Sequence, residues 1–237
     1  MPARRAPSNL ALIPAWNEAE RLEPVLRRVS SYLPLLVVDD GSSDDSAQVA
    51  ESCGASVVRH PGNRGKGAAL LTGFRWALEH GYDAVLTLDA DGQHDPDEIP
   101  AFLEIQERTG ADLVIGRRDF SRMPFPRSLS NPFGSWLLSL VLGQPIYDNQ
   151  CGFRLYRRPI LELANQDAVG FEFEVDVIAD AVKMGLSLAW VDVATIYNTG
   201  KVSYFHPIKD SARFLAAVWR AWRRPWASGR SRRARTR

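Results

Sequence analysis

The chain has 237 residues, of which 45% are hydrophobic and 24% are charged, and its formal net charge is +1. This composition is that of an ordinary globular protein with room for one sizeable α/β domain or two small ones. Two cysteines, Cys53 and Cys151, exclude a disulfide scaffold, and no run reaches the ~18 apolar residues that a membrane span needs.

The small net charge hides an uneven distribution. From Ser211 onward there are nine arginines and no acidic residue, which leaves 20 basic against 28 acidic side chains in the rest of the chain. Such basic tails are usually disordered and bind polyanions, either nucleic acid or anionic lipid. We interpret residues 1–7 as a disordered tip rather than a signal peptide, because Pro14 interrupts the apolar run that follows.

Apolar β-branched runs alternate with helical patterns along the chain. Strands are predicted at 10–14, 35–40, 55–60, 84–89 and 111–116. Helices are predicted at 18–33, 44–54, 65–81 and 95–110. Asn17 is the expected cap of the first helix, and Asp95 and Pro96 open the last. This rhythm predicts an α/β fold with a doubly wound, mostly parallel sheet that binds ligands at the carboxyl ends of its strands.

Polar sequences follow four of the predicted strands: "PAWNE", "DDGSSDD", "DADGQ" and "GRRD". The third is the most informative, because its strand is apolar up to Asp89 and is then followed by Asp91 and Asp95. Carboxylates this close repel one another unless a cation, donors or water compensate. Two carboxylates one residue apart can share Mg²⁺ or Mn²⁺ with a diphosphate.

Two other loop types fit less well. A calcium loop starting at Thr87 would use Asp89, Asp91, Asp95 and Glu98, but it lacks an acidic first ligand and follows a strand. The sequence "PGNRGKGAAL" is glycine-rich before a helix, yet it has neither P-loop nor dinucleotide-binding spacing. It is either a tight turn or a loop that brings backbone and Lys66 to a ligand.

Several blocks together resemble family 2 glycosyltransferases with the GT-A fold. These are "IPAWNE" (13–18), "VVDDGSSDDS" (37–46), "GNRGKGAAL" (62–70) and "LDADGQHDP" (88–96). The blocks "DNQCGFRLYRR" (148–158), "GFEFEVDVI" (170–178) and "KVSYFHPIKDS" (201–211) resemble the dolichyl-phosphate mannose synthase branch of polyprenyl-phosphate glycosyltransferases. The resemblance implies a single GT-A domain at 8–205, with a nucleotide-sugar half at 8–116 and an acceptor half at 117–205.

The resemblance also implies an activity and its residues. A hexose would move with inversion from a GDP-mannose or UDP-glucose type donor to a polyprenyl or dolichyl phosphate, with Mg²⁺ or Mn²⁺ as cofactor. The implied donor-binding residues are Pro14, Ala15, Trp16, Glu18, Asp40, Lys66, Asp89, Ala90 and Asp91. The implied metal-binding residues are Asp89, Asp91 and Gln93. The implied acceptor-phosphate residues are Arg117, Arg118, Arg127, Ser130, Lys201 and Ser203, with Arg154 as a further candidate. Asp91, Arg118 and Lys201 are the implied catalytic residues.

The chemical class of the acceptor determines which side chains the transfer reaction needs. A phosphate monoester is largely ionised at neutral pH, so as a nucleophile it needs cationic groups rather than a strong base. A hydroxyl acceptor would instead need a general base, for which Asp148, Glu172 and Glu174 are candidates. Asn131 stands where the family usually has a phosphate-binding arginine. Either Arg117 compensates for that change, or the acceptor is not a simple polyprenyl phosphate.

Two segments are candidates for membrane contact. Residues 131–143 are predicted as a helix, either in the core or at a membrane interface. A C-terminal amphipathic helix is predicted at 206–226, ahead of a basic disordered tail at 227–237. Its apolar residues fall within about 140° of arc; they are Phe214, Leu215, Val218, Trp219, Trp222 and Trp226. Arg213, Arg220, Arg223 and Arg224 fall on the opposite side.

That pattern is typical of a helix lying in the plane of an anionic membrane surface. The alternative is a helix docked on the sheet with its arginines in water. We therefore expect a cytoplasmic protein held peripherally on the inner face of the membrane, and the sequence names no protein partner.

Two other function classes are less consistent with these features. A sugar-1-phosphate nucleotidyltransferase would need a glycine- and arginine-rich loop after the first strand, where this chain has "PAWNE". A nucleic-acid-binding protein would explain the arginine tail, but its acidic loops would repel phosphates. We expect no nucleic-acid partner.

Overall fold

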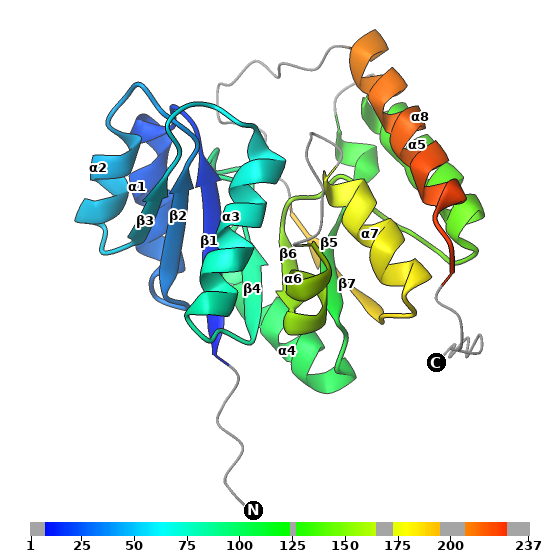
Figure 1. The fold of residues 1–237 in the computed structure, drawn as a ribbon, viewed down its shortest axis with the longest axis horizontal. Coiled ribbons are helices and arrows are strands. Elements are labelled where there is room, and N and C mark those ends of the chain that lie inside the picture. The colour runs from blue at the N-terminus through cyan, green and yellow to red at the C-terminus, as the bar shows by residue number, and fades with distance from the viewer. Residues whose placement is uncertain (1–7, 124–126, 165–172, 195–206, 227–237) are drawn as a thin grey trace, which may run out of the picture.

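A computed structural model describes residues 8–123, 127–164, 173–194 and 207–226 (Figure 1). The strands are β1 (Asn9–Ala15), β2 (Leu35–Asp39), β3 (Ser56–Arg59), β4 (Ala84–Thr87), β5 (Leu113–Arg118), β6 (Arg154–Arg157) and β7 (Leu188–Val193). The helices are α1 (Ala19–Val29), α2 (Ser46–Ser52), α3 (Lys66–Glu79), α4 (Ile99–Thr109), α5 (Arg127–Leu142), α6 (Arg158–Ala164), α7 (Phe173–Lys183) and α8 (Pro207–Arg223). The predicted tip 1–7 and tail 227–237 lie outside the described residues.

These strands form one sheet in the order β3-β2-β1-β4-β6-β5-β7. All neighbouring pairs are parallel except those of β6, which runs antiparallel to β4 and β5. The doubly wound, mostly parallel sheet predicted from the sequence is confirmed. Since Ala15 pairs with Asp39 in the parallel register, the carboxyl ends of β1 and β2 lie side by side.

Helices cover both faces of the sheet, as the buried strands require. One hydrophobic core lies between the sheet and α3, α5, α6, α7 and α8, and it includes Phe74, Leu138 and Ile178. The other lies between the sheet and α1, α2 and α4, and it includes Leu26 and Phe102. Figure 1 shows α3, α6 and α7 over the first face.

The two predicted helix caps differ in outcome. Asp95 is a cap, because its carboxylate accepts a hydrogen bond from the backbone N–H of Asp97, 3.1 Å away, in the short turn that leads into α4. The prediction for Asn17 is wrong, since the cap position of α1 is Glu18. Asn17 has a positive φ of 54°, and its side-chain oxygen accepts from the N–H of Ser43, 2.8 Å away. Its side chain therefore joins the loops after β1 and β2.

Helix α5 has one face in the core and one face outside it. Leu138 and Leu142 are buried, whereas Phe133, Trp136 and Leu140 are exposed. The core and interfacial interpretations of residues 131–143 therefore each describe one side of the same helix. Within the described ranges, no helix has the length and hydropathy that crossing a bilayer would require.

Helix α8 packs beside α5 and α7 (Figure 1). A Cβ on Gly134 of α5 would lie 3.1 Å from the ring of Phe214, so the missing side chain leaves room for that phenyl ring. The buried side of α8 also carries three small or medium side chains, Ala217, Val218 and Ala221.

The structure corrects the predicted apolar and basic sides of α8. Phe214 and Val218 belong to the side that faces the protein, not to an outer apolar face. Arg220 and Arg224 do not extend into water away from the protein, because both bind Asp176 of α7, at 2.9 and 3.0 Å. A narrower outer stripe remains on α8, and it consists of Leu215, Trp219 and Trp222. The helix ends at Arg223 rather than at 226, and the centre of the Trp226 ring beyond it lies 4.2 Å from Lys183 Nζ of α7.

Candidate active site

The ends of β1 and β2 form the first part of the site. Trp16 is half exposed directly after β1, while Pro14 is half-buried and Ala15 and Glu18 are buried. The backbone N–H of Asp40 donates to the carbonyl oxygen of Ala15 at 2.8 Å. An aromatic ring is thus presented to solvent next to the end of β2.

The buried carboxylate of Asp40 holds the glycine-rich loop before α3. It accepts hydrogen bonds from the backbone N–H groups of Gly65 at 2.7 Å and Arg64 at 3.0 Å. His60 Nδ1 lies 2.6 Å from the same carboxylate, and His60 Nε2 lies 2.9 Å from the hydroxyl of Thr72. This network places Lys66, the first residue of α3, at the carboxyl edge of the sheet.

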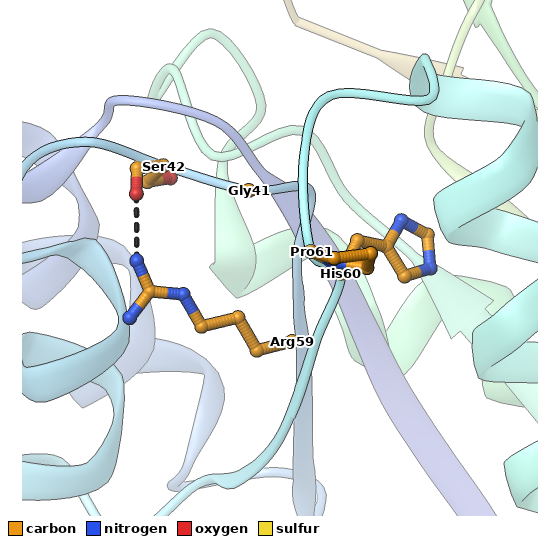
Figure 2. A pocket seen from close by; sticks show the side chains of 5 residues that line it. All are labelled: Gly41, Ser42, Arg59, His60 and Pro61. Carbon is orange, nitrogen blue, oxygen red and sulfur yellow. Dashed lines mark hydrogen bonds between the residues drawn. The ribbon is translucent and has the colours of Figure 1, made fainter.

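A pocket of about 420 Å³ opens beside these strand ends. Figure 2 shows its lining residues, which are Gly41, Ser42, Arg59, His60 and Pro61. Arg59 donates to the carbonyl oxygen of Ser42 at 2.7 Å, whereas the His60 ring points the other way, toward α3. Gly41 has a φ of +73°, and a Cβ there would lie 2.4 Å from the Cα of Gly62. The glycine therefore lets the two loops meet.

The second part of the site lies after β4 and joins three distant segments. The Lys66 ammonium lies 2.6 Å from Asp89 Oδ1 and 3.0 Å from Glu174 Oε1. Burial alone would raise the pKa of Asp89, but the charge of Lys66 and then the contact with His94 outweigh it and hold that pKa well below its usual range. Asp89 is therefore ionised and paired with Lys66, a contact that sequence spacing does not reveal.

Asp91 has a different environment two residues further along the loop. Burial and then the charge of Asp89 raise the pKa of the Asp91 carboxyl, although an N–H from Gln93 at 3.0 Å opposes the shift. Ala90 between the two aspartates is buried. His94 is also buried, with Nε2 at 3.7 Å from Asp89 and its ring tilted against Phe153.

The loop before β6 covers the Asp89–Lys66 pair. A Cβ on Gly152 would lie 2.6 Å from Asp89 Oδ2 and 2.8 Å from Lys66 Nζ. The carbonyl oxygen of Gly152 accepts from the hydroxyl of Thr87 at 2.7 Å, which holds this loop against β4. Glycine is therefore the residue whose backbone can lie this close to both charges.

Arg154 is not an acceptor-phosphate residue, and that prediction is wrong. Its side chain is fully buried, and its guanidinium donates to the carbonyl oxygens of Cys151, Glu174 and Asn149 at 2.6, 2.8 and 3.0 Å. Each of the three guanidinium nitrogens thus donates to a backbone oxygen, and these oxygens lie on two separate segments. Arg154 instead fixes the loop before β6 to the first turn of α7, where Glu174 meets Lys66.

The predicted acceptor residues Arg117 and Arg118 point to opposite sides of β5 and have different partners. Arg118 binds Asp148, with Nε–Oδ2 at 2.7 Å and Nη2–Oδ1 at 3.0 Å. Arg117 binds Asp192 of β7 at 2.5 and 2.8 Å, and its guanidinium lies 5.2 Å from the ring centre of Tyr147. The structure therefore does not bring the two arginines together as one phosphate site.

The remaining acceptor candidates are described only in part. Ser130 is exposed on α5, and Arg127 is the first residue of that helix. Asn131 is buried, and its amide donates to the sulfur of Met123 at 3.4 Å. Lys201, Ser203 and the candidate base Glu172 lie outside the described residues.

Comparison with known proteins identifies the family. The model of the family described as "Glycosyl transferase family 2" matches residues 11–163. The chain belongs to glycosyl transferase family 2. This match confirms the resemblance found in the sequence, and it includes the ends of β1, β2 and β4.

Three relatives are similar to this protein over most of its chain. The polyprenol monophosphomannose synthase of Mycolicibacterium smegmatis is 34% identical, over 78% of this chain and 76% of its own length. The undecaprenyl-phosphate mannosyltransferase of Micrococcus luteus is also 34% identical, over 79% and 83%. A UDP-N-acetylglucosamine–dolichyl-phosphate N-acetylglucosaminyltransferase of Methanococcus voltae is 27% identical, over 79% and 85%.

Solved structures of glycosyltransferases share the fold. Glucosyl-3-phosphoglycerate synthase from Mycobacterium tuberculosis, in complex with phosphoglyceric acid, superposes with a TM-score of 0.72 and 21% identity. The superposition covers 91% of this chain and 80% of that one. A second structure of that enzyme contains Mn²⁺, UDP and glucosyl-3-phosphoglycerate, with a TM-score of 0.70. The chain is thus a glycosyltransferase with the GT-A fold, as the sequence predicts.

Proposed function

We propose that this glycosyltransferase moves a hexose from a nucleotide sugar to the phosphate of a polyprenyl or dolichyl phosphate. The observation that carries this proposal is the ion pair of Lys66 with Asp89, two residues before Asp91, at the carboxyl edge of the sheet beside the ends of β1 and β2. The named relatives support the acceptor class, since two of them are named for polyprenol and undecaprenyl phosphate. The proposed domain limits are those predicted from the sequence, 8–116 for the donor half and 117–205 for the acceptor half.

The donor would lie along the ends of three adjacent strands. Trp16 offers an exposed ring for the base, next to Pro14, Ala15 and Glu18. Asp40 acts by shaping the loop at 60–65, because backbone N–H groups and His60 already bind its carboxylate. Lys66 and the sequence Asp89-Ala90-Asp91 would then contact the diphosphate. This order along the sheet edge suits an extended ligand such as a nucleotide sugar better than any single loop does.

The carboxylates after β4 fit a divalent metal that is bound together with its ligand. Among the described residues, no three His, Cys, Asp or Glu side chains converge on one metal-binding position. Asp89 and Asp91 provide two hard oxygen donors, with Gln93 nearby, and burial together with the charge of Asp89 raises the pKa of Asp91. Mg²⁺ and Mn²⁺ are commonly held by one or two carboxylates plus phosphate oxygens and water. Such an ion would stabilise the charge on the departing diphosphate.

The acceptor phosphate would approach from the β5 side. Asp148 holds the Arg118 guanidinium in a fixed orientation, so Arg118 can steer an anionic oxygen without reorganising. The proposed acceptor set also contains Arg127, Ser130, Lys201 and Ser203, and the proposed catalytic residues are Asp91, Arg118 and Lys201. Arg117 is left out of this set, because Asp192 and the Tyr147 ring hold it on the other side of β5. In-line attack by a phosphate oxygen on the anomeric carbon breaks the bond to the diphosphate and inverts that carbon.

The ion pairs favour a phosphate acceptor over a hydroxyl acceptor. Asp148 is bound to Arg118 and Glu174 is bound to Lys66, so two of the three candidate bases already neutralise a cation. Either carboxylate could take a proton from a hydroxyl only after its cation had moved away. An ionised phosphate needs no such base.

We also propose that the enzyme works at the cytoplasmic surface of a membrane. The outer stripe of α8 and the exposed residues of α5 are apolar, and α8 packs beside α5. Exposed aromatic side chains on a surface helix, together with basic residues, are typical of interfacial binding. The five arginines at 230, 232, 233, 235 and 237 would add attraction to anionic lipid.

One assay tests the donor, the acceptor and the metal together. Purified full-length protein is incubated with Mn²⁺ or Mg²⁺, undecaprenyl or dolichyl phosphate, and radiolabelled nucleotide sugars one at a time. We expect label in the organic phase with one donor, and loss of that label with Asp91→Asn or with a chelator. If neither lipid is labelled although a donor binds with Mn²⁺ in a calorimeter, the proposed acceptor is wrong, and Asn131 is then the first residue to examine.

A further inference from the structure

Lys66, Asp89 and Glu174 form an ion triplet made by three separate segments. Lys66 begins α3, Asp89 follows β4, and Glu174 lies in the first turn of α7. The ammonium is 2.6 Å from Asp89 Oδ1 and 3.0 Å from Glu174 Oε1. Asp89 is thus a proposed metal ligand whose oxygen is already bound by a cation from the chain itself.

We infer that Lys66 is an internal counter-ion that competes with free divalent cations for Asp89 and moves to the diphosphate when the donor binds. Glu174 is the positioning residue that keeps the ammonium at the site in both states. This inference rests on the proposed function, because it assumes that Asp89 binds metal together with a diphosphate. Its consequence is that metal and nucleotide bind far better together than either does alone.

The competition follows from where the ammonium lies. A divalent ion on Asp89 Oδ1 would have to share that oxygen with a positive group only 2.6 Å from it. Like charges at such separations repel strongly where water is scarce. Gly152 closes one side of the pair, since even a Cβ there would come within 2.8 Å of Lys66 Nζ. Lys66 must therefore leave Asp89 for the metal to bind fully.

The lysine is the member of the triplet that can move. Its ammonium sits on a flexible four-carbon stem, and about a third of its side chain is exposed. Glu174 is fixed, because Arg154 donates to its carbonyl oxygen at 2.8 Å and its carboxylate is largely buried. A diphosphate would provide Lys66 with new anionic acceptors in place of the Asp89 carboxylate.

Binding of Mn²⁺ to the free protein tests the competition directly. Unbound Mn²⁺ is measured by electron paramagnetic resonance in titrations of full-length wild type, Lys66→Gln and Lys66→Arg, without nucleotide. We expect Lys66→Gln to bind Mn²⁺ about five-fold more tightly than wild type, the lower end of typical coupling between sites. Lys66→Arg keeps the positive charge and should behave as wild type does.

The same proteins are then titrated with UDP and with GDP at saturating Mn²⁺ in a calorimeter. We expect Lys66→Gln to bind the preferred diphosphate about ten-fold more weakly, because the ammonium no longer reaches it. If Lys66 moves from Asp89 to the diphosphate, its replacement should strengthen Mn²⁺ binding and weaken nucleotide binding. Equal or weaker Mn²⁺ binding by Lys66→Gln would overturn the inference.

A double-mutant cycle tests the positioning role of Glu174. Glu174→Gln should weaken diphosphate binding in the wild-type background but have no further effect in Lys66→Gln, because it acts through Lys66. A loss of equal size in both backgrounds would overturn the positioning role of Glu174. If wild type and all variants fail to bind Mn²⁺ even with nucleotide, the metal-dependent function itself is wrong. If wild type binds both ligands but Lys66→Gln matches it, only this inference fails.

Discussion

The guanidinium of Arg118 and the carboxylate of Asp148 form a two-point ion pair, with Nε–Oδ2 at 2.7 Å and Nη2–Oδ1 at 3.0 Å. Asp148 is fully buried, and it also accepts the backbone N–H groups of Gln150 and Cys151. The carboxylate therefore orders the loop before β6 as well as orienting Arg118. A proposed acceptor residue and the loop that covers Asp89 thus depend on the same side chain.

Asp148→Asn should destabilise the protein and weaken use of the acceptor. Leaving one charge of a buried pair unmatched typically costs about 3–5 kcal/mol, and Arg118 retains some exposure, so we expect the lower end. Urea unfolding measures this cost, and the KM for polyprenyl phosphate measures the loss of orientation. The matched variant Arg118→Lys keeps the charge but loses the two-point contact, so it should raise that KM with less effect on stability. An unchanged unfolding free energy in Asp148→Asn would contradict the assignment.

Gly152→Ala should disable the donor site while the fold persists. The new methyl would lie 2.6 Å from Asp89 Oδ2, so either the carboxylate or the loop must shift. We expect at least about a ten-fold loss of kcat/KM, since displacements near 1 Å at reacting groups cost that much or more.

Gly134→Ala is the control for that clash. Its methyl would lie 3.1 Å from the ring of Phe214, between α5 and α8. Gly134→Ala should lower the melting temperature without weakening nucleotide binding in Mn²⁺. If both variants lose nucleotide binding equally, general loosening of the fold explains the effect rather than contact with Asp89.

Stability should fall at alkaline pH because of two buried groups. Burial raises the pKa of the Cys151 thiol and of the Tyr156 phenol to about 12 each. Both groups stay neutral in the folded state and ionise more easily once unfolded. Their contribution to the free energy of unfolding is therefore complete below pH 9, the ordinary pKa of a thiol. It is lost as the pH rises toward 12.

The slope of that loss can be measured. Each group should remove about 1.4 kcal/mol per pH unit within its window. Urea unfolding at pH 7, 9 and 10 measures the slope, and Cys151→Ala should flatten it between pH 9 and 10, where the thiol contributes most. A stability that stays constant up to pH 10 would show that the thiol does not ionise on unfolding.

Two aromatic positions on α8 should separate membrane binding from folding. Trp219 and Trp222 are exposed, so replacing both with alanine should change the unfolding free energy by no more than about 0.5 kcal/mol per site. The same change should reduce sedimentation with vesicles that contain anionic lipid. Phe214→Ala, at the contact with Gly134, should instead destabilise the protein by about 2 kcal/mol. Vesicle binding that survives loss of both tryptophans would place the membrane contact elsewhere.

Local pattern was sufficient for the first five strands and for the loops at their carboxyl ends, but it did not predict β6 or β7. The β-branched runs and the turns between them are short-range signals, and parallel strands necessarily bring their carboxyl ends to one edge. That is why the sequence alone led to Asp89, Asp91 and the loop after β2. The glycosyltransferase assignment followed from the same blocks, which the family match confirms.

The partners of charged side chains depended on tertiary contacts. Nothing near Lys66 in the sequence indicates Glu174, more than a hundred residues later, and Arg154 looks like any surface arginine until three carbonyl oxygens surround it. Helical periodicity could place the arginines of α8 on one side, but it could not show that Asp176 of α7 lies there. A sequence determines which side of an element is polar, whereas only packing determines whether water or an opposite charge meets it.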